Sequence, residues 1–132
     1  MSSNVDVRIP VSVGELADKV TILRLKSERI KDPVKLKNVE TELLLLVPLL
    51  AQIAVEHPEL SVLTDELAVV NGKLWSIEDG KRDCERSKRF DQSFIELARA
   101  VYIENDNRAE IKRRINAVTG SRIVEEKSYE RY

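Results

Sequence analysis

The residues best suited to chemistry lie in a long predicted helix, on the face that should be apolar. Between residues 94 and 118 apolar side chains recur at helical spacing, but Glu104 and Arg108 occupy two of those positions. A carboxylate and a guanidinium one helical turn apart can form an ion pair. Burying such a pair costs desolvation free energy, and apolar residues there are often more stable. The two charges therefore suggest a functional polar site.

Further polar and aromatic side chains are expected around this pair, some on the same helix and some on an antiparallel neighbour. They are Tyr102, Asn105, Arg114, Asn71, Trp75 and Glu78. In such a site Arg108 and Arg114 would hold a small anion, because guanidinium matches carboxylate and phosphate. Glu104 or Glu78 would act as acid or base, and Trp75 or Tyr102 would form a wall. A second interpretation stays open: the stripe turns outward at Glu104, and the pair is a solvent-exposed contact contributing roughly 0.3–0.5 kcal/mol.

Signatures of catalysis or of cofactor binding are missing from the sequence. His57 is the only histidine and Cys84 the only cysteine, and no Gly-rich phosphate loop, nucleophile elbow or zinc knuckle is present. We therefore predict no catalytic residue, no metal ligand and no cofactor. One carboxylate-only site for a hard cation stays conceivable. It would use Glu78, Asp79, Glu104 and Asp106.

Composition limits the class of protein. The chain has 132 residues, 42% of them apolar, and a net charge of −1, which indicates one folded domain and argues against nucleic-acid binding. The basic run from Lys81 to Arg89 is interleaved with acids, so it predicts a solvated helix face. The lone cysteine and the absence of a secretion signal favour the cytoplasm. The longest apolar run, residues 43–55, is shorter than the roughly 20 residues of a membrane span, so we expect none.

The elements expected to position these residues are helices. Four of them are predicted, beginning at Ser12, at Asp32, after Pro58 and at Asp91, the last ending at Gly120. Ser12 and Glu15 match a capping box, and each helix carries an apolar stripe with alternating spacings of three and four. Within the second helix, Pro48 predicts a kink or a break. The fold class is therefore all-α: an antiparallel helical bundle of about four helices with coiled-coil-like packing.

One helical domain, residues 1–132, is expected to comprise an extended arm (1–11), the bundle (12–119) and a tail (120–132). The arm alternates apolar and polar residues from Val5 to Val11, as strands do. It would pair with the tail segment 122–129 or with another subunit, or else lie extended on the bundle. The last two helices are longer, about 28 residues or roughly 42 Å. Their ends should therefore protrude or contact a partner.

Four stretches carry a resemblance to a known family: SVGELADKVTILRLKSERIKDPVKLKNVETEL, VNGKLWSIED, VYIENDNRAEIKRRIN and EEKSY. Over residues 12–129 the chain resembles a family of small, uncharacterised, helical bacterial and phage-type proteins. The resemblance implies an occurrence near or fused to glycosyltransferase and surface-polysaccharide modules, and it implies no reaction. Charged and amide residues inside these stretches would suit an anionic ligand. They are Glu15, Lys19, Lys26, Glu28, Arg29, Asn105, Arg108 and Arg114.

Taken together, these patterns predict a non-enzymatic helical interaction module that binds a protein partner or associates with itself as a homodimer or larger oligomer. Its contacts would come from the leucine-rich second helix and the long hairpin. The alternative is a binder or enzyme for a small anionic metabolite, such as a sugar nucleotide, at the polar site around Glu104 and Arg108.

Overall fold

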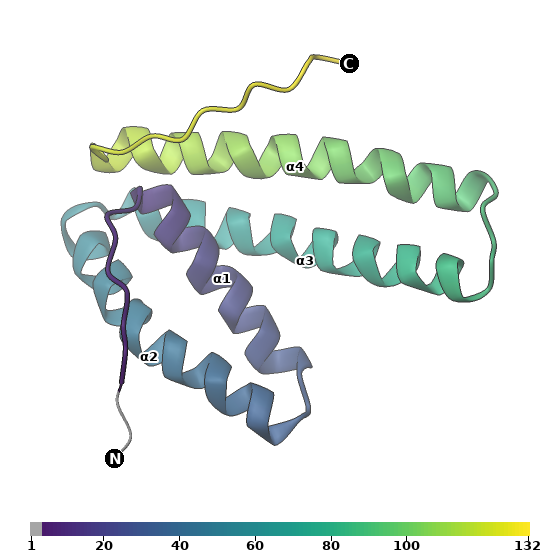
Figure 1. The fold of residues 1–132 in the computed structure, drawn as a ribbon. Helices are drawn as coiled ribbons and strands as arrows, with labels where there is room; N and C mark the ends of the chain where they lie inside the picture. The colour runs from purple at the N-terminus through teal and green to yellow at the C-terminus, as the bar shows by residue number, and fades with distance from the viewer. Residues whose placement is uncertain (1–3) are drawn as a thin grey trace.

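A computed structural model describes residues 4–132 as four α-helices with extended segments at both ends (Figure 1). The helices are α1 (Val13–Arg29), α2 (Pro33–Glu56), α3 (Glu59–Arg86) and α4 (Gln92–Thr119). The predicted all-α fold is confirmed. The helices form two antiparallel hairpins, α1–α2 and α3–α4, which meet at one end and diverge toward the other (Figure 1).

The helix ends follow local signals in the sequence. Ser12, Asp32 and Asp91 each accept a hydrogen bond from a backbone N–H of the first helical turn. These bonds satisfy donors that have no partner within the helix. At the other end of α4, Gly120 has φ 65°, a left-handed conformation that ends the helix at little steric cost.

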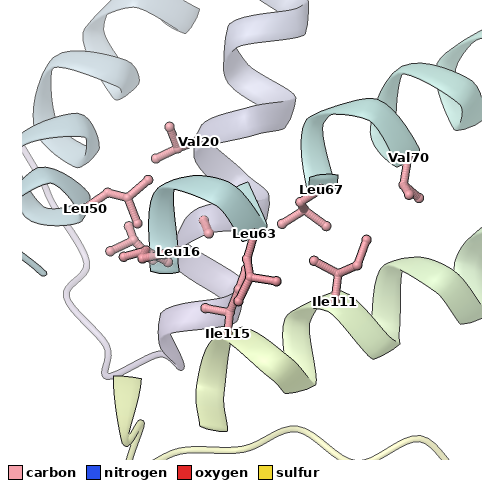
Figure 2. Packing of buried hydrophobic residues seen from close by; sticks show 10 residues of the cluster. Leu16, Val20, Leu50, Leu63, Leu67, Val70, Ile111 and Ile115 are labelled. Atoms are coloured by element: carbon pink, nitrogen blue, oxygen red, sulfur yellow. The ribbon is translucent and has the colours of Figure 1, made fainter. Parts of the chain in front are cut away.

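The hydrophobic core lies where the two hairpins meet, and all four helices contribute to it (Figure 2). It consists of Leu16, Ala17, Val20, Leu50, Leu60, Leu63, Leu67, Val70, Ile111 and Ile115. These residues belong to the predicted stripes, except Ala17. Farther along the α3–α4 hairpin the core thins out, and Cys84 is the one buried side chain of α3 beyond Asn71. That end of the hairpin protrudes, as its length predicted (Figure 1).

Helix α2 has two apolar faces. The inner face is the predicted stripe, which is buried or half-buried: Leu36, Val39, Leu43, Leu46, Leu50 and Ile53. The outer face presents Leu44, Leu45 and Leu49, which are 78%, 58% and 50% exposed. By length and composition alone α2 could cross a membrane, and only 11% of its apolar window is buried. The predicted break at Pro48 is wrong, because α2 is continuous from Pro33 to Glu56.

The predicted pairing of the arm with the tail is also wrong. Residues 4–11 and 121–132 are extended but contain no strand, and they run in different directions (Figure 1). The tail turns back along α4 because Ser121 and Glu125 accept hydrogen bonds at the start of α1. The first three residues of the predicted arm lie outside the described residues. Pairing of the arm with another subunit stays a prediction.

Candidate functional site

A buried carboxylate, Asp18, lies where α1 crosses α3 and α4. Its side chain is only 2% exposed. Arg108 donates to both carboxylate oxygens, from Nε to Oδ1 at 3.0 Å and from Nη2 to Oδ2. Asn71 of α3 donates to Oδ1 as well, at 2.9 Å. Such a bidentate, charge-assisted contact is among the stronger hydrogen-bonded pairs in proteins, and it offsets part of the cost of burying the charge.

Close contact between α1 and α4 places Asp18 opposite Arg108. A Cβ atom on Gly14 would lie 2.7 Å from the backbone oxygen of Lys112, so only glycine permits this approach. The N–H of Gly14 donates to Oδ1 of Asn116 at 2.7 Å. The sequence therefore positions the site through a residue without a side chain.

Thr21 completes the network on the side of α3. Its hydroxyl donates to the backbone oxygen of Asp18 at 2.8 Å and accepts from Nδ2 of Asn71 at 2.9 Å. Thr21 and Asn71 are both buried. Buried polar groups that all have partners hold one arrangement of the helices in place.

Lys112 extends the site toward solvent. Its Nζ donates to Oε2 of Glu15 at 2.7 Å and lies 3.8 Å from Oδ2 of Asp18. The hydrogen bonds that Arg108 donates to the Asp18 carboxylate raise the pKa of Arg108. The side chains of Arg108 and Lys112 are 31% and 18% exposed. Carboxylates of α1 thus hold both cations, while part of each side chain stays open to solvent.

The predicted ion pair between Glu104 and Arg108 is not among the ion pairs of residues 4–132. The guanidinium turns to α1 because Asp18, which is almost fully buried, needs a charged partner there. Oε2 of Glu104 is buried and has no hydrogen-bond partner within the described chain. The sequence thus marked the correct guanidinium, but the carboxylate that binds it comes from another helix.

The polar side chains around Asp18, which are Arg108, Asn71, Thr21 and Lys112, form the Asp18 cluster. Among the other predicted site residues, Asn71 therefore belongs to this cluster, and Asn105 lines a groove beside Arg108. Tyr102 is exposed and lies near the ring of Tyr132, with the ring centroids 6.3 Å apart. It belongs to the adjoining part of the same groove.

Three predicted site residues, Trp75, Glu78 and Arg114, make their contacts away from the Asp18 cluster. The Trp75 ring packs against Arg29, whose guanidinium lies 5.4 Å from the ring centroid. Glu78 is exposed and pairs with Lys81 on its own helix. Arg114 is also exposed and pairs with Glu66 of α3 at 3.4 Å. These three are therefore not part of the Asp18 cluster.

The groove runs between α4 and the tail and has a volume of about 510 Å³ next to Arg108. Its inner wall includes Arg108, Lys112 and Arg113, and its outer wall includes Glu125 and Glu126.

The tail is attached to the helices at several points along this groove. Ser12 Oγ donates to Glu125 Oε1 at 2.7 Å, and Lys127 pairs with Asp106. The pKa of Asp106 is lowered, first by the hydrogen bond from Lys127 and then by one from Tyr132. The pKa of Tyr132 is raised by the same contact with Asp106.

Sequence reasoning missed Asp18, Thr21 and the tail. Asp18 lies between the apolar positions Ala17 and Val20 of α1, and this was the one available signal for its burial. Within residues 4–132, no group of three histidine, cysteine, aspartate or glutamate side chains is placed to hold a metal ion.

Comparison with known proteins gives one match. A family model described as a family of unknown function (DUF6165) matches residues 7–132. No curated protein and no solved structure matches the chain.

Proposed function

The chain belongs to this family of unknown function, and we propose that it is a non-enzymatic helical interaction module that self-associates through the outer face of α2. The observation that carries the proposal is the unpartnered apolar surface of Leu44, Leu45 and Leu49. Exposed apolar surface of this kind commonly marks an interaction site. An oligomer would bury it while the inner face of α2 stays in the core.

The outer face is complementary to itself, which favours a second copy of the chain as the partner. It consists of Lys37, Thr41, Leu44, Leu45, Pro48, Leu49, Gln52 and Glu56, all of them exposed. In a two-fold interface, residue i contacts j and j contacts i. An axis between Leu45 and Pro48 in an antiparallel α2 pair would bring Leu44 to Leu49 of the partner subunit. The same axis would bring Lys37 to Glu56 of the partner subunit, so opposite charges would meet at both ends.

Analytical ultracentrifugation tests this proposal. Wild type should be a dimer, and Leu44→Glu combined with Leu45→Glu should be a folded monomer, because the carboxylates would be buried without partners. Val69→Glu is the control, since Val69 is 59% exposed on α3, away from α2. It should stay a dimer. A wild type that is monomeric at high concentration would overturn the proposal.

Charge reversal tests the antiparallel geometry. Lys37→Glu alone and Glu56→Lys alone should each weaken the dimer, because like charges would then meet at both ends. The two reversals together should restore it. If wild type instead floats with lipid vesicles and the leucine variants do not, the face is a membrane surface and the proposal fails.

We extend the proposal to the cellular setting that the resemblance implies. A self-associating module in the cytoplasm would hold glycosyltransferases or other surface-polysaccharide enzymes together. The support is the sequence resemblance alone. A tagged chain should co-purify such enzymes from its host, and the monomeric leucine variant should co-purify fewer of them.

A second candidate function is the binding of a small anionic metabolite at Arg108 and Lys112. The observation in its favour is that Asp18 and Glu15 orient the two cations, whose open sides line the groove. Cations that are fixed in advance lose little conformational entropy when an anion binds.

A further inference from the structure

We propose that the groove between α4 and the tail binds a nucleoside phosphate, with the phosphates at Arg108, Lys112 and Arg113 and the base at the tyrosines. This inference deepens the second, anion-binding candidate and is independent of self-association. The ligand class is a nucleoside phosphate, and the site lies on the surface of α4 under the tail and not around Glu104.

The phosphate end is defined by three cations on one stretch of α4. A guanidinium has five N–H donors, and Asp18 takes two of those of Arg108, which leaves others for a ligand. Lys112 has three donors and gives one to Glu15. Arg113 lines the same hollow, and its ion pair with Glu110 on the same helix is exposed to solvent. Fixed guanidinium and ammonium groups are suited to phosphate oxygens.

The base end is defined by aromatic rings. A second hollow of about 830 Å³ adjoins the first and shares Asn105, Arg113, Lys127 and Tyr129 with it, so the groove is continuous. The three tyrosines of the chain all line this second hollow. They are Tyr102, Tyr129 and Tyr132, which are 61%, 84% and 82% exposed. The rings of Tyr102 and Tyr132 lie 6.3 Å apart, and Nζ of Lys127 lies 5.8 Å from the centroid of the Tyr129 ring. Because all three rings are still mostly exposed, each offers a face to a planar base, and such stacking is worth about 1–3 kcal/mol per base.

The two ends are spaced for one ligand. Tyr102 and Arg108 are separated by about 9 Å along α4 at 1.5 Å per residue, the scale of a nucleoside with its first phosphates. The tail forms the outer wall, and its contacts from Glu125 to Ser12 and from Lys127 to Asp106 hold it there. The ligand site is therefore formed before a ligand arrives, as most small-molecule sites are.

Two carboxylates of the tail, Glu125 and Glu126, oppose the ligand, and Glu125 is held by a hydrogen bond from Ser12. Glu126 lines the hollow that contains the three cations, and it makes no ion pair within the described chain. Its negative charge would repel a phosphate. Glu126→Gln should therefore tighten binding while the rest of the groove stays the same.

Isothermal titration of the full chain with ADP, pyrophosphate and adenosine tests the inference. ADP should bind at least about tenfold more tightly than either fragment, because it occupies both ends. Tyr102→Ala should weaken ADP about tenfold and leave pyrophosphate unchanged. Arg113→Gln should weaken both. The control is Arg114→Gln, which removes an exposed arginine that pairs with Glu66 outside the groove and should change neither.

Two results would overturn the inference. If ADP shows no saturable binding, the groove is not a nucleotide site. If pyrophosphate binds as tightly as ADP and Tyr102→Ala has no effect, the anion-binding candidate stands but the nucleoside assignment fails. Circular dichroism of each variant confirms that its helices are intact. The oligomeric state is measured separately, so failure of self-association is distinguishable from either result.

Discussion

Replacing Asp18 with asparagine would test whether its contact with Arg108 determines how α1 packs on α4. The amide keeps the acceptor Oδ1 but turns a donor toward Nη2 of Arg108 and toward Nζ of Lys112. The two cations would then face a group that cannot accept from them. Breaking a buried ion pair typically costs about 3–5 kcal/mol. Arg108 is 31% exposed and can reach water, so we expect a loss of about 2–3 kcal/mol.

For a domain of this size that loss lowers the melting temperature by roughly 6–12 °C. Urea denaturation followed by circular dichroism gives the free energy of unfolding, with Asp79→Asn on the exposed face of α3 as the control. The Asp79→Asn control should change the free energy of unfolding by less than about 0.5 kcal/mol. Asp18→Leu combined with Arg108→Met should lose less than the sum of the two single variants, because no charge is left unpaired. Strict additivity, or an Asp18→Asn variant as stable as wild type, would refute the reasoning.

Three further predictions concern other parts of the chain. Gly14→Ala should destabilise the protein because its Cβ would meet the backbone of α4. Gly72→Ala, where nothing lies within 4 Å, should be neutral or stabilise it by up to about 1 kcal/mol, and chemical denaturation compares the two. Glu104→Leu should raise the melting temperature, since it removes a buried oxygen without a partner, and a lower value would show that the carboxylate is needed. The contact between Asp106 and Tyr132 should stabilise the docked tail above about pH 4 and below about pH 10. NMR of the Tyr132 ring should show release as pH falls through the lowered pKa of Asp106 or rises through the raised pKa of Tyr132.

The helices could be predicted from the sequence because their signals are local. Caps such as Ser12 and Asp91, the left-handed Gly120 and the three-four stripes all act within a few residues. The break predicted at Pro48 is wrong because α2 continues through this residue from Pro33 to Glu56, while the alternative of a kink stays a prediction. The angle between the hairpins was not predictable, because it depends on how Gly14 packs against a distant helix.

The candidate site was predictable in part. Charges on the stripe of α4 identified Arg108, because a half-buried guanidinium interrupts an apolar pattern. Its partner Asp18 could not be identified in the same way, since which helix faces α4 is a property of the tertiary fold. The groove could not be predicted from the sequence either, because the tail has no periodic pattern of apolar residues. Its course along α4 depends on tertiary contacts such as that of Ser12 with Glu125.

The way α1 begins has a consequence for how the chain folds. Its first N–H groups bond to the side chains of Ser121 and Asn116, and Ser12 bonds to Glu125. The partners in these three bonds are more than 100 positions apart in the chain. On the ribosome, α1 therefore emerges with an incomplete first turn, whereas each hairpin forms from neighbouring segments. Contacts between distant segments are slow to form, so we expect joining of the two hairpins to limit the folding rate. The native state is completed only when the segment after α4 returns to the first helix.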